Sequence, residues 1–455
     1  MDFPRTIKFI AVCVALFLGG NSAIAQLGVT KGRKEIFIPN HVYRVPDSND
    51  YNDNSSEYSY QRMVQSDNIA VFWAKEFGDD PMSNPDTARR FDIHAALHEC
   101  ERFYDYFTDT LKFVERGKSW TDNYKVLFFV IGGNEGTAFG GGADEKVGIL
   151  WTPPVRINKA PYATLAHELG HAFQYLLRAD GGRGLGGPMA EMTSQYMLWQ
   201  VYPEWMTLEN YHLVSFMEKT HFAFLHPTNM YHSPYILEYW SGKHGKDFVA
   251  RLWRESNERE DAVMTYKRLN QMDQSTFNDE MFDAYRRFIT WDMDRIREIA
   301  APYANQHFTS LVDAGGGWYR IDSTKCPQNY GYNGIQLEVP KPGATVELQF
   351  RGLAGAYGYH AHHQDKAGWR YGFVAYRKDG ERVYGSIHSD AEGRTVKFKV
   401  PKGTEYLWLV VMGAPKEHWA IPMRRRGQQN EAPKEEQWPY QIKLSGTSIA
   451  DSILH

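Results

Sequence analysis

The chain has 455 residues, a formal net charge of −4, and an aromatic content of 15% that includes 13 tryptophans and 28 tyrosines. This length allows two or three domains with substantial cores. The slightly acidic balance gives no sign of a nucleic-acid-binding protein, which would show a clustered positive charge. The many aromatic side chains are typical of a sugar-binding surface or of a well-packed β-rich protein.

The first 25 residues have the pattern of a cleaved export signal. Arg5 and Lys8 form a basic start, an apolar stretch covers 9–18, and Ala23-Ile-Ala25 is an A-x-A cleavage site. We therefore predict a secreted or periplasmic protein that is cut after Ala25. The apolar stretch is too short to span a membrane and no later stretch approaches the required length, so no transmembrane segment is expected.

Only Cys100 and Cys326 remain after the signal peptide. Export permits a disulfide between them, and two buried thiols are the alternative.

The region before residue 160 alternates between strand and helix patterns. Apolar runs predict strands at 69–74, 124–131 and 147–152, and a helical period lies within 85–114. The glycine-rich stretch 132–142 is predicted as a loop, and it does not fit a phosphate-binding loop because it lacks the G-x-x-x-x-G-K-[ST] pattern. The strand at 147–152 has two open interpretations: an edge strand that pairs with an extended substrate, or an ordinary strand inside a sheet.

The next stretch, 163–177, predicts an amphipathic helix that carries His167-Glu168-Leu-Gly-His171. Two histidines at positions i and i+4 lie one above the other and can hold one metal ion. Neutral imidazole suits zinc, whose catalytic sites have three protein ligands and an open fourth position. Glu168 can then act as the general base toward water. Gln174 lies on the same side, as a contact of the site or as a solvated amide.

A second helix is predicted from Met189, and its Glu191 is our third zinc ligand. Nineteen residues separate His171 from Glu191, which allows one helix to end and the chain to turn back. A first-turn glutamate favoured by the helix dipole is the alternative role. Asp180 is the competing ligand. The third histidine that metzincins require is absent, because Leu177 occupies its place.

The H-E-x-x-H motif with Glu191 at this distance resembles the gluzincin group of metallopeptidases. The form His-Glu-Leu-Gly-His-Ala-Phe-Gln also resembles the helix of enhancin- and mucinase-like peptidases, and residues from about 65 to 300 resemble a secreted bacterial family of unknown function with a peptidase-like core. Two departures matter. Gluzincins often carry an aspartate shortly after the third ligand, where Thr193, Ser194 and Gln195 stand here. The aminopeptidase G-x-M-E-N element is missing, which disfavours an aminopeptidase.

Residues 201–300 are predicted to be mainly helical. The resemblance implies that a tyrosine or histidine in this region donates a hydrogen bond to the oxyanion, with Tyr231, His232 and Tyr235 as candidates. Packing in the core is the alternative role for each of them. Residues 277–299 predict an amphipathic helix with a solvated outer face.

From Gly315 onward, short alternating or apolar runs between turn residues predict a β-sandwich, with the chain dividing near 315–330. Four aromatic residues are either a sugar-stacking platform or core residues: Trp369, Tyr371, Trp408 and Trp419. Three histidines are either a second metal site or part of a polar loop: His360, His362 and His363.

The sequence thus predicts an α+β protein with a signal peptide (1–25), a zincin-like catalytic domain of mixed sheet and helices (26–314), and an all-β sandwich domain (315–455). The predicted function is an exported zinc (Zn²⁺) metallohydrolase of the gluzincin type that acts on a peptide or glycopeptide. The alternative is a catalytically inactive zincin-like protein that binds glycan or a protein partner through its C-terminal sandwich.

Overall fold

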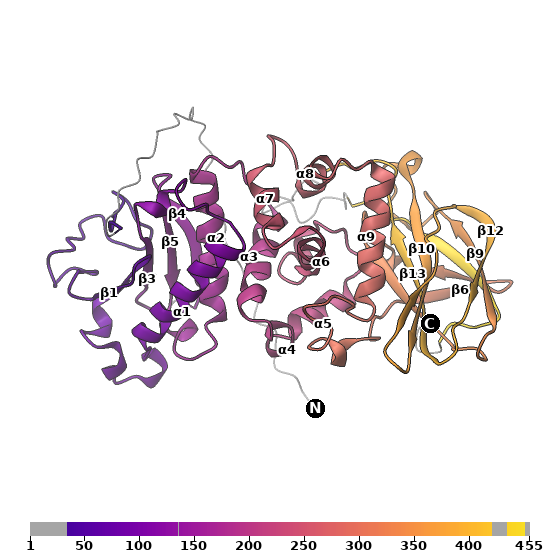
Figure 1. The fold of residues 1–455 in the computed structure, drawn as a ribbon, viewed down its shortest axis with the longest axis horizontal. Helices are drawn as coiled ribbons and strands as arrows, with labels where there is room; N and C mark the ends of the chain where they lie inside the picture. The colour runs from indigo at the N-terminus through magenta and orange to yellow at the C-terminus, as the bar shows by residue number, and fades with distance from the viewer. Residues whose placement is uncertain (1–33, 135, 421–434, 451–455) are drawn as a thin grey trace.

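The structure is a computed structural model that describes residues 34–134, 136–420 and 435–450. The predicted signal peptide lies outside these residues. Figure 1 shows an elongated molecule with a mixed sheet at one end, a layer of helices in the middle and a β-rich part at the other end. Within the described ranges, no helix combines the length and the apolar character needed to cross a membrane.

The N-terminal sheet has five strands in the order β1-β2-β3-β5-β4. Its strands are β1 (Met63–Gln65), β2 (Ile69–Trp73), β3 (Val126–Val130), β4 (Phe139–Ala143) and β5 (Val147–Thr152). The three central strands β2, β3 and β5 run parallel and are fully buried, which explains their nearly continuous apolar sequences. The helices α1 (Ile93–Asp105) and α2 (Ala163–Ala179) lie beside this sheet (Figure 1).

The edge of the sheet differs from the prediction. The strand predicted at 147–152 is β5, which pairs with both β3 and β4, so the edge-strand interpretation of this stretch is wrong. The edge is β4, which runs antiparallel to β5 within the glycine-rich stretch predicted as a loop. The loop prediction is therefore wrong for residues 139–142.

The glycines of β4 have a packing role against α2. A Cβ atom at Gly140 would lie 2.0 Å from the backbone oxygen of Glu168, and one at Gly142 would lie 2.2 Å from the ring of Tyr175. Real Cβ atoms do not approach other atoms so closely, so only glycine lets this strand lie directly against the helix that carries the H-E-x-x-H motif.

The middle of the molecule is helical, as predicted. Its helices are α3 (Pro188–Val201), α4 (Trp205–Leu208), α5 (Tyr211–Glu218), α6 (Tyr235–His244), α7 (Phe248–Arg254), α8 (Ala262–Leu269) and α9 (Gln274–Phe288). Every residue of α3 except Ala190 is buried, because α3 lies between α2 and the remaining helices (Figure 1).

The helix predicted at 277–299 is α9, but it ends at Phe288 and it is not a solvated outer helix. Most of its residues are buried, and it packs against the strands β10 and β13 (Figure 1). Its arginines take part in this packing: Arg286 donates a hydrogen bond to the backbone of Gly385 at 2.7 Å. Charge alone was therefore a poor guide to exposure.

The C-terminal part consists of two antiparallel sheets with the orders β11-β10-β13-β8 and β12-β9-β14-β7-β6. The strands are β6 (Leu311–Gly315), β7 (Trp318–Ile321), β8 (Tyr332–Leu337), β9 (Thr345–Gly352), β10 (Trp369–Arg377), β11 (Arg382–Tyr384), β12 (Glu392–Lys399), β13 (Thr404–Gly413) and β14 (Tyr440–Ser445). A β-rich C-terminal part of an α+β chain is therefore confirmed.

Two hydrophobic cores run through the chain. One lies between the two C-terminal sheets, where the rings of Tyr371 and Tyr440 stack on Phe350 at centroid distances of 4.2 and 5.6 Å. The other contains the N-terminal sheet and the helices, and it extends into β10 and β13 through Val374 and Trp408. The division into separate domains at residue 314 stays a prediction, and β6 begins slightly before it.

Cys100 and Cys326 are both buried and both free, so the two-thiol alternative holds and there is no disulfide between them.

Candidate metal centre

The two histidines of the motif lie on successive turns of α2. Their rings meet edge to face with centroids 4.8 Å apart, and their Nε2 atoms are 3.2 Å from each other. The apolar positions Leu165, Leu169 and Phe173 of the same helix are completely buried, so packing fixes the rotation of α2 and hence the direction of both imidazoles.

The third group comes from the beginning of α3. Gly187 has a φ of 63°, a left-handed conformation that suits glycine, and Pro188 then starts the helix. Glu191 therefore lies in the first turn. Gly170, inside the motif, allows α3 to come close, because a Cβ there would lie 3.1 Å from Oγ of Ser194.

The three side chains form a nearly equilateral set of ligand atoms. Oε2 of Glu191 lies 3.2 Å from Nε2 of His167 and 3.2 Å from Nε2 of His171. A tetrahedral zinc ion with bonds of about 2.0–2.1 Å separates neighbouring ligand atoms by about 3.4 Å, so this triangle fits zinc. Among the residues that the structure describes, this is the one group of three or more His, Cys, Asp or Glu side chains placed to hold a metal ion.

Each of the two histidines contacts a glutamine through Nδ1, the ring nitrogen that is not part of the ligand triangle. Oε1 of Gln195 lies 3.2 Å from Nδ1 of His167, and Oε1 of Gln174 lies 3.4 Å from Nδ1 of His171. An amide oxygen accepts the Nδ1 proton, so Nε2 is the nitrogen that each histidine would offer to a metal ion. Gln195 and Gln174 therefore both contact the histidines of the site, and Gln174 is not a solvated amide.

The hydrogen bonds between His167 and Glu191 shift the pKa values of these two groups in opposite directions. Burial alone would lower the pKa of His167, but its hydrogen bond to Glu191 and the charges of Glu168 and Glu191 raise it to about 9. Burial alone would raise the pKa of Glu191, but the hydrogen bonds to His167 and His171 hold it well below its usual range. Glu191 is therefore a carboxylate held in its charged form beside two imidazoles, which is the form that binds a metal ion.

Glu168 is next to His167 on α2, and its side chain is almost completely buried. Burial raises the pKa of its carboxyl group above the usual value, against the charges of the two histidines. A carboxylate with a raised pKa is a better proton acceptor at neutral pH, which suits a general base.

The three oxyanion candidates differ in position. The ring of Tyr231 stacks on that of His167 at a centroid distance of 6.4 Å, so Tyr231 lies at the site. His232 lies one layer further away, with Nδ1 2.7 Å from Nδ1 of His212.

Tyr235 lies in the aromatic core, where its ring packs on Trp291 and Phe216 at centroid distances of 4.9 and 4.8 Å. None of its surface is exposed. A substrate cannot reach it, so the structure corrects its assignment as an oxyanion donor to a packing role.

Two other sequence candidates lie elsewhere. Oδ1 of Asp180 accepts a hydrogen bond from the backbone N–H of Trp120 at 2.9 Å, so Asp180 is not the third ligand. In the C-terminal part, the carboxylate of Glu436 accepts hydrogen bonds from the backbone N–H groups of His362 and His363, which makes these histidines part of a structured polar loop.

The proposed sugar-stacking platform is wrong for three of its four residues. Trp369, Tyr371 and Trp408 are 3%, 1% and 0% exposed, so they are core residues. Trp419 is partly exposed, and its ring packs on His363.

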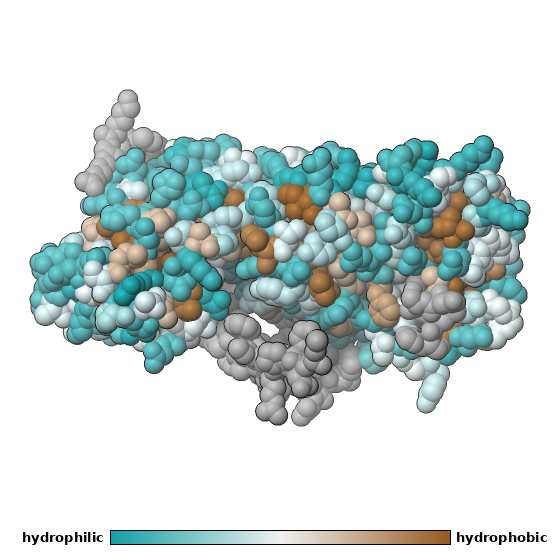
Figure 2. Space-filling view, turned by 90° about the horizontal axis from the view of Figure 1, so that it is seen from below, coloured by the Kyte–Doolittle hydropathy of each residue, from teal (hydrophilic) through white to brown (hydrophobic). Residues whose placement is uncertain are grey.

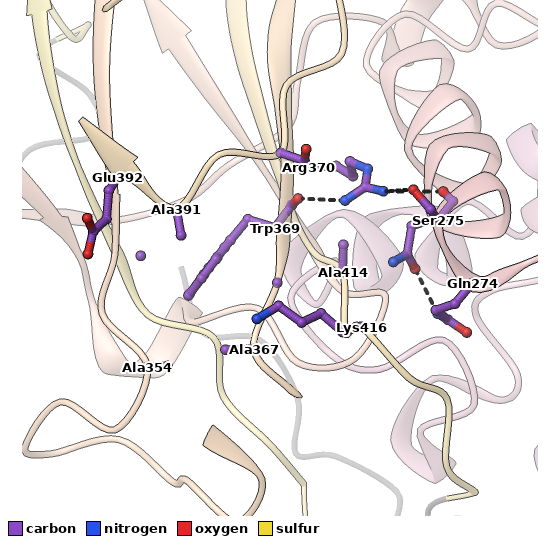
Figure 3. Close-up of a pocket in the computed structure, with 14 residues that line it drawn as sticks. Gln274, Ser275, Ala354, Ala367, Trp369, Arg370, Ala391, Glu392, Ala414 and Lys416 are labelled. Carbon is purple, nitrogen blue, oxygen red and sulfur yellow. Dashed lines mark hydrogen bonds between the residues drawn. The ribbon is translucent and has the colours of Figure 1, made fainter. Parts of the chain in front are cut away.

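A separate pocket of about 520 Å³ lies at the seam between α9 and the C-terminal sheets (Figure 3). Glu392 lies on one side of Trp369, while Ser275 and Gln274 of α9 lie on the other, and Arg370 reaches across to Ser275. None of the residues that line this pocket belongs to the metal centre.

A family model described as "Family of unknown function (DUF6055)" matches residues 29–451, which is nearly the whole chain. No curated protein matches the chain. One solved structure, the M60 catalytic domain with the CBM51-1 and CBM51-2 domains from Clostridium perfringens ZmpB, is 10% identical and covers 87% of this chain and 60% of that chain, with a TM-score of 0.28.

Two further matches cover only part of the chain. The C-terminal family 22 carbohydrate binding module of Clostridium thermocellum Xyn10B is 9% identical over 30% of this chain and 76% of its own, with a TM-score of 0.18. The mitogen of Yersinia pseudotuberculosis is 8% identical over 30% of this chain and 85% of its own, with a TM-score of 0.19. At such TM-scores, none of these similarities carries an argument about function.

Proposed function

We propose that this chain, which belongs to the DUF6055 family, is an exported zinc-dependent hydrolase that cleaves a peptide or glycopeptide. One observation carries this proposal: the ligand atoms of His167, His171 and Glu191 lie 3.2 Å from one another in a triangle that fits a tetrahedral metal with one open position.

The residues around the triangle supply the other parts of a hydrolytic mechanism. When bound, zinc would polarise the scissile carbonyl group and lower the pKa of water. Glu168 would accept a proton from the attacking water and return it to the leaving amine, for which its raised pKa is suitable. Tyr231, whose ring lies against that of His167, would donate a hydrogen bond from its hydroxyl group to the developing oxyanion.

The proposed reaction class is that of a gluzincin-type peptidase with a zincin-like catalytic part. Support comes from the placement of the third ligand on a second helix and from an antiparallel edge strand, β4, directly beside α2. Among the strands that the structure describes, β4 pairs only with β5, so its outer edge would offer backbone groups to an extended chain. The missing aspartate would suggest an inactive protein, because no carboxylate then orients the histidine ligand. Gln195 answers this objection, because its amide oxygen also accepts the Nδ1 proton of His167.

An inactive protein that binds glycan through its C-terminal part is the second candidate. The burial of Trp369, Tyr371 and Trp408 counts against the stacking surface on which it was based. The pocket beside Trp369 favours a binding role of some kind, since its volume of about 520 Å³ is that of a small-molecule site (Figure 3).

The decisive test uses the mature chain reloaded with zinc and a panel of peptides and glycopeptides. Cleavage by the wild type that disappears after metal removal and returns with zinc supports the hydrolase. Stoichiometric zinc without any cleavage, together with saturable glycan binding, would favour the second candidate.

A further inference from the structure

The orientation of Gln195 follows from the tautomer of His167. An imidazole that presents Nε2 to a metal carries its proton on Nδ1, and Nδ1 of His167 lies 3.2 Å from Oε1 of Gln195. Since Nδ1 donates, the amide oxygen must be on this side, and the NH₂ group of Gln195 must face away from the metal centre.

The NH₂ group has two protons and two neighbours that can accept them. Nε2 of Gln195 lies 3.0 Å from the backbone oxygen of Tyr231 and 3.4 Å from Nε2 of His212. Because Nε2 of His212 accepts, a neutral His212 carries its proton on Nδ1. That atom lies 2.7 Å from Nδ1 of His232, which must then accept, so the proton of His232 is on Nε2.

We propose that Gln195 is a positioning residue that connects the metal ligand His167 to the segment carrying Tyr231 and His232. Gln195 fixes the backbone of Tyr231 and the tautomer of His232. The connection makes His232 present an Nε2–H donor. This inference rests on the proposed zinc site, because it starts from a His167 that binds metal through Nε2.

The surroundings of the two outer histidines support the connection, because it requires both to be neutral. Burial lowers the pKa of His212 to about 3 and that of His232 to about 4. The ring of Trp205 covers His212 at a centroid distance of 5.2 Å. The carboxylate of Glu209 is 3.9 Å from Nε2 of His212 and accepts a hydrogen bond from the indole N–H of Trp205.

The chain offers a direct comparison in Gln174. Its Oε1 lies near Nδ1 of His171, and its NH₂ group donates to the backbone oxygen of Ala190 and to Oγ of Ser194, each at 2.9 Å. Gln174 therefore connects a metal ligand to α3, whereas Gln195 connects one to the segment around Tyr231. An aspartate has only acceptor atoms and could not make either second contact.

The test uses three variants of the zinc-loaded full chain. Gln195→Glu keeps an acceptor for His167 but replaces the NH₂ group with a second acceptor, and Gln195→Leu removes both. Gln174→Leu is the matched control, since it frees the other ligand without touching Tyr231 or His212. The tautomers of His212 and His232 are read from the ¹⁵N and ¹³C shifts of labelled histidine, assigned with His212→Gln and His232→Gln, and backbone hydrogen exchange is measured over 226–234.

We expect His232 to be the Nε2–H tautomer and His212 the Nδ1–H tautomer in the wild type and in Gln174→Leu. Both tautomers should become mixed in Gln195→Glu and Gln195→Leu, and exchange in 226–234 should rise about tenfold or more. Zinc affinity should fall by about 10–100-fold in both leucine variants and change little in Gln195→Glu.

An Nδ1–H tautomer of His232 in the zinc-loaded wild type would overturn the inference, as would Gln195→Glu with unchanged tautomers and exchange. Either result with normal zinc uptake leaves the proposed function standing. Failure of the wild type to take up zinc would overturn both.

Discussion

Glu168 is the residue whose chemistry the proposed mechanism needs most directly. Its carboxyl group is buried beside His167 and its pKa is raised by that burial. Gln has nearly the same shape and can fill the same space, but its amide cannot accept a proton from water.

We therefore expect Glu168→Gln to retain zinc at the wild-type ratio and to lose hydrolysis by about 10²–10⁴-fold. Elemental analysis and peptide turnover on the same preparation check this. Wild-type turnover by the variant would exclude Glu168 as the base.

Tyr231 and Tyr235 make a matched pair, because only the first lies at the metal centre. Tyr231→Phe keeps the ring next to His167 but removes the hydroxyl group, so kcat should fall by about tenfold or more, consistent with the loss of one oxyanion donor, while KM changes little. Tyr235→Phe should leave kcat unchanged, since its ring is in the aromatic core. Equal effects of the two substitutions on kcat would contradict the assignment.

The sequence could predict that His167, His171 and Glu191 come together, because the spacing within one helix and the length of the connection to the next were sufficient. The i, i+4 spacing fixes His167 relative to His171, and one turn back brings Glu191 to them. Their outer contacts could not be predicted, because Gln195, His212 and His232 come from different segments that only the tertiary packing brings together. For the same reason the sequence leaves two roles open for Tyr235, oxyanion donor or core residue, because sequence position does not show which side of a helix start faces the core.

At the scale of elements, β4 is where local sequence patterns failed. Glycine-rich sequence ordinarily predicts turns, and no β-branched residues mark Phe139–Ala143 as a strand. Its glycines are there because α2 presses against the strand, which is a long-range requirement. The helix α9 shows a different error. Its charged residues predict a solvated face, but Arg286 and Asp283 pair with each other on a helix whose residues are mostly buried.

Neighbouring glycines of β4 allow a controlled test of this packing. Gly140→Ala would place its Cβ 2.0 Å from the backbone oxygen of Glu168, whereas a Cβ at Gly141 would meet nothing within 4 Å. We expect Gly140→Ala to lower the free energy of unfolding by about 1–3 kcal/mol or more and to weaken zinc binding. Gly141→Ala should change stability by less than about 1 kcal/mol. Chemical denaturation measures both, and similar values for the two variants would contradict the close packing of β4 on α2.

At the scale of the whole molecule, one hydrophobic core connects the helices to the C-terminal strands, which the sequence predicts as separate domains. The alternating strands after residue 315 correctly predicted a β-rich part, because a period-two alternation can be recognised within one strand without knowing which strand pairs with it. The pattern could not show that β10 and β13 pack on the helices through Val374 and Trp408. Figure 2 shows one long face of the molecule that is mostly hydrophilic, with separate apolar patches. The largest fully buried side chains are tryptophans and tyrosines, so many of the aromatic residues pack in the interior.

Buried histidines make the stability of the whole molecule depend on pH. Burial lowers the pKa of four of them: His212 and His307 to about 3, and His221 and His232 to about 4. Below about pH 6.5 the unfolded chain binds protons at these groups and the folded chain does not, so stability falls as pH falls from about 6.5 to 4. Each group contributes a slope of up to about 1.4 kcal/mol per pH unit.

Urea unfolding of the zinc-loaded protein at pH 7, 6 and 5 should therefore give successively lower free energies of unfolding. Asp180, whose pKa burial raises to about 6, and Glu168, whose pKa burial also raises, act in the opposite direction, but they are two groups against four. Constant or rising stability between pH 6.5 and 5 would show that these histidines are not held neutral.

The most direct measurement for the whole account is the zinc content of the purified mature chain after metal removal and reloading. The geometry of His167, His171 and Glu191 predicts about one zinc per chain, and predicts that His167→Ala and Glu191→Ala variants that remain folded lose it. A folded wild-type chain that takes up no zinc, or that keeps its zinc when these ligands are replaced, would contradict the central claim.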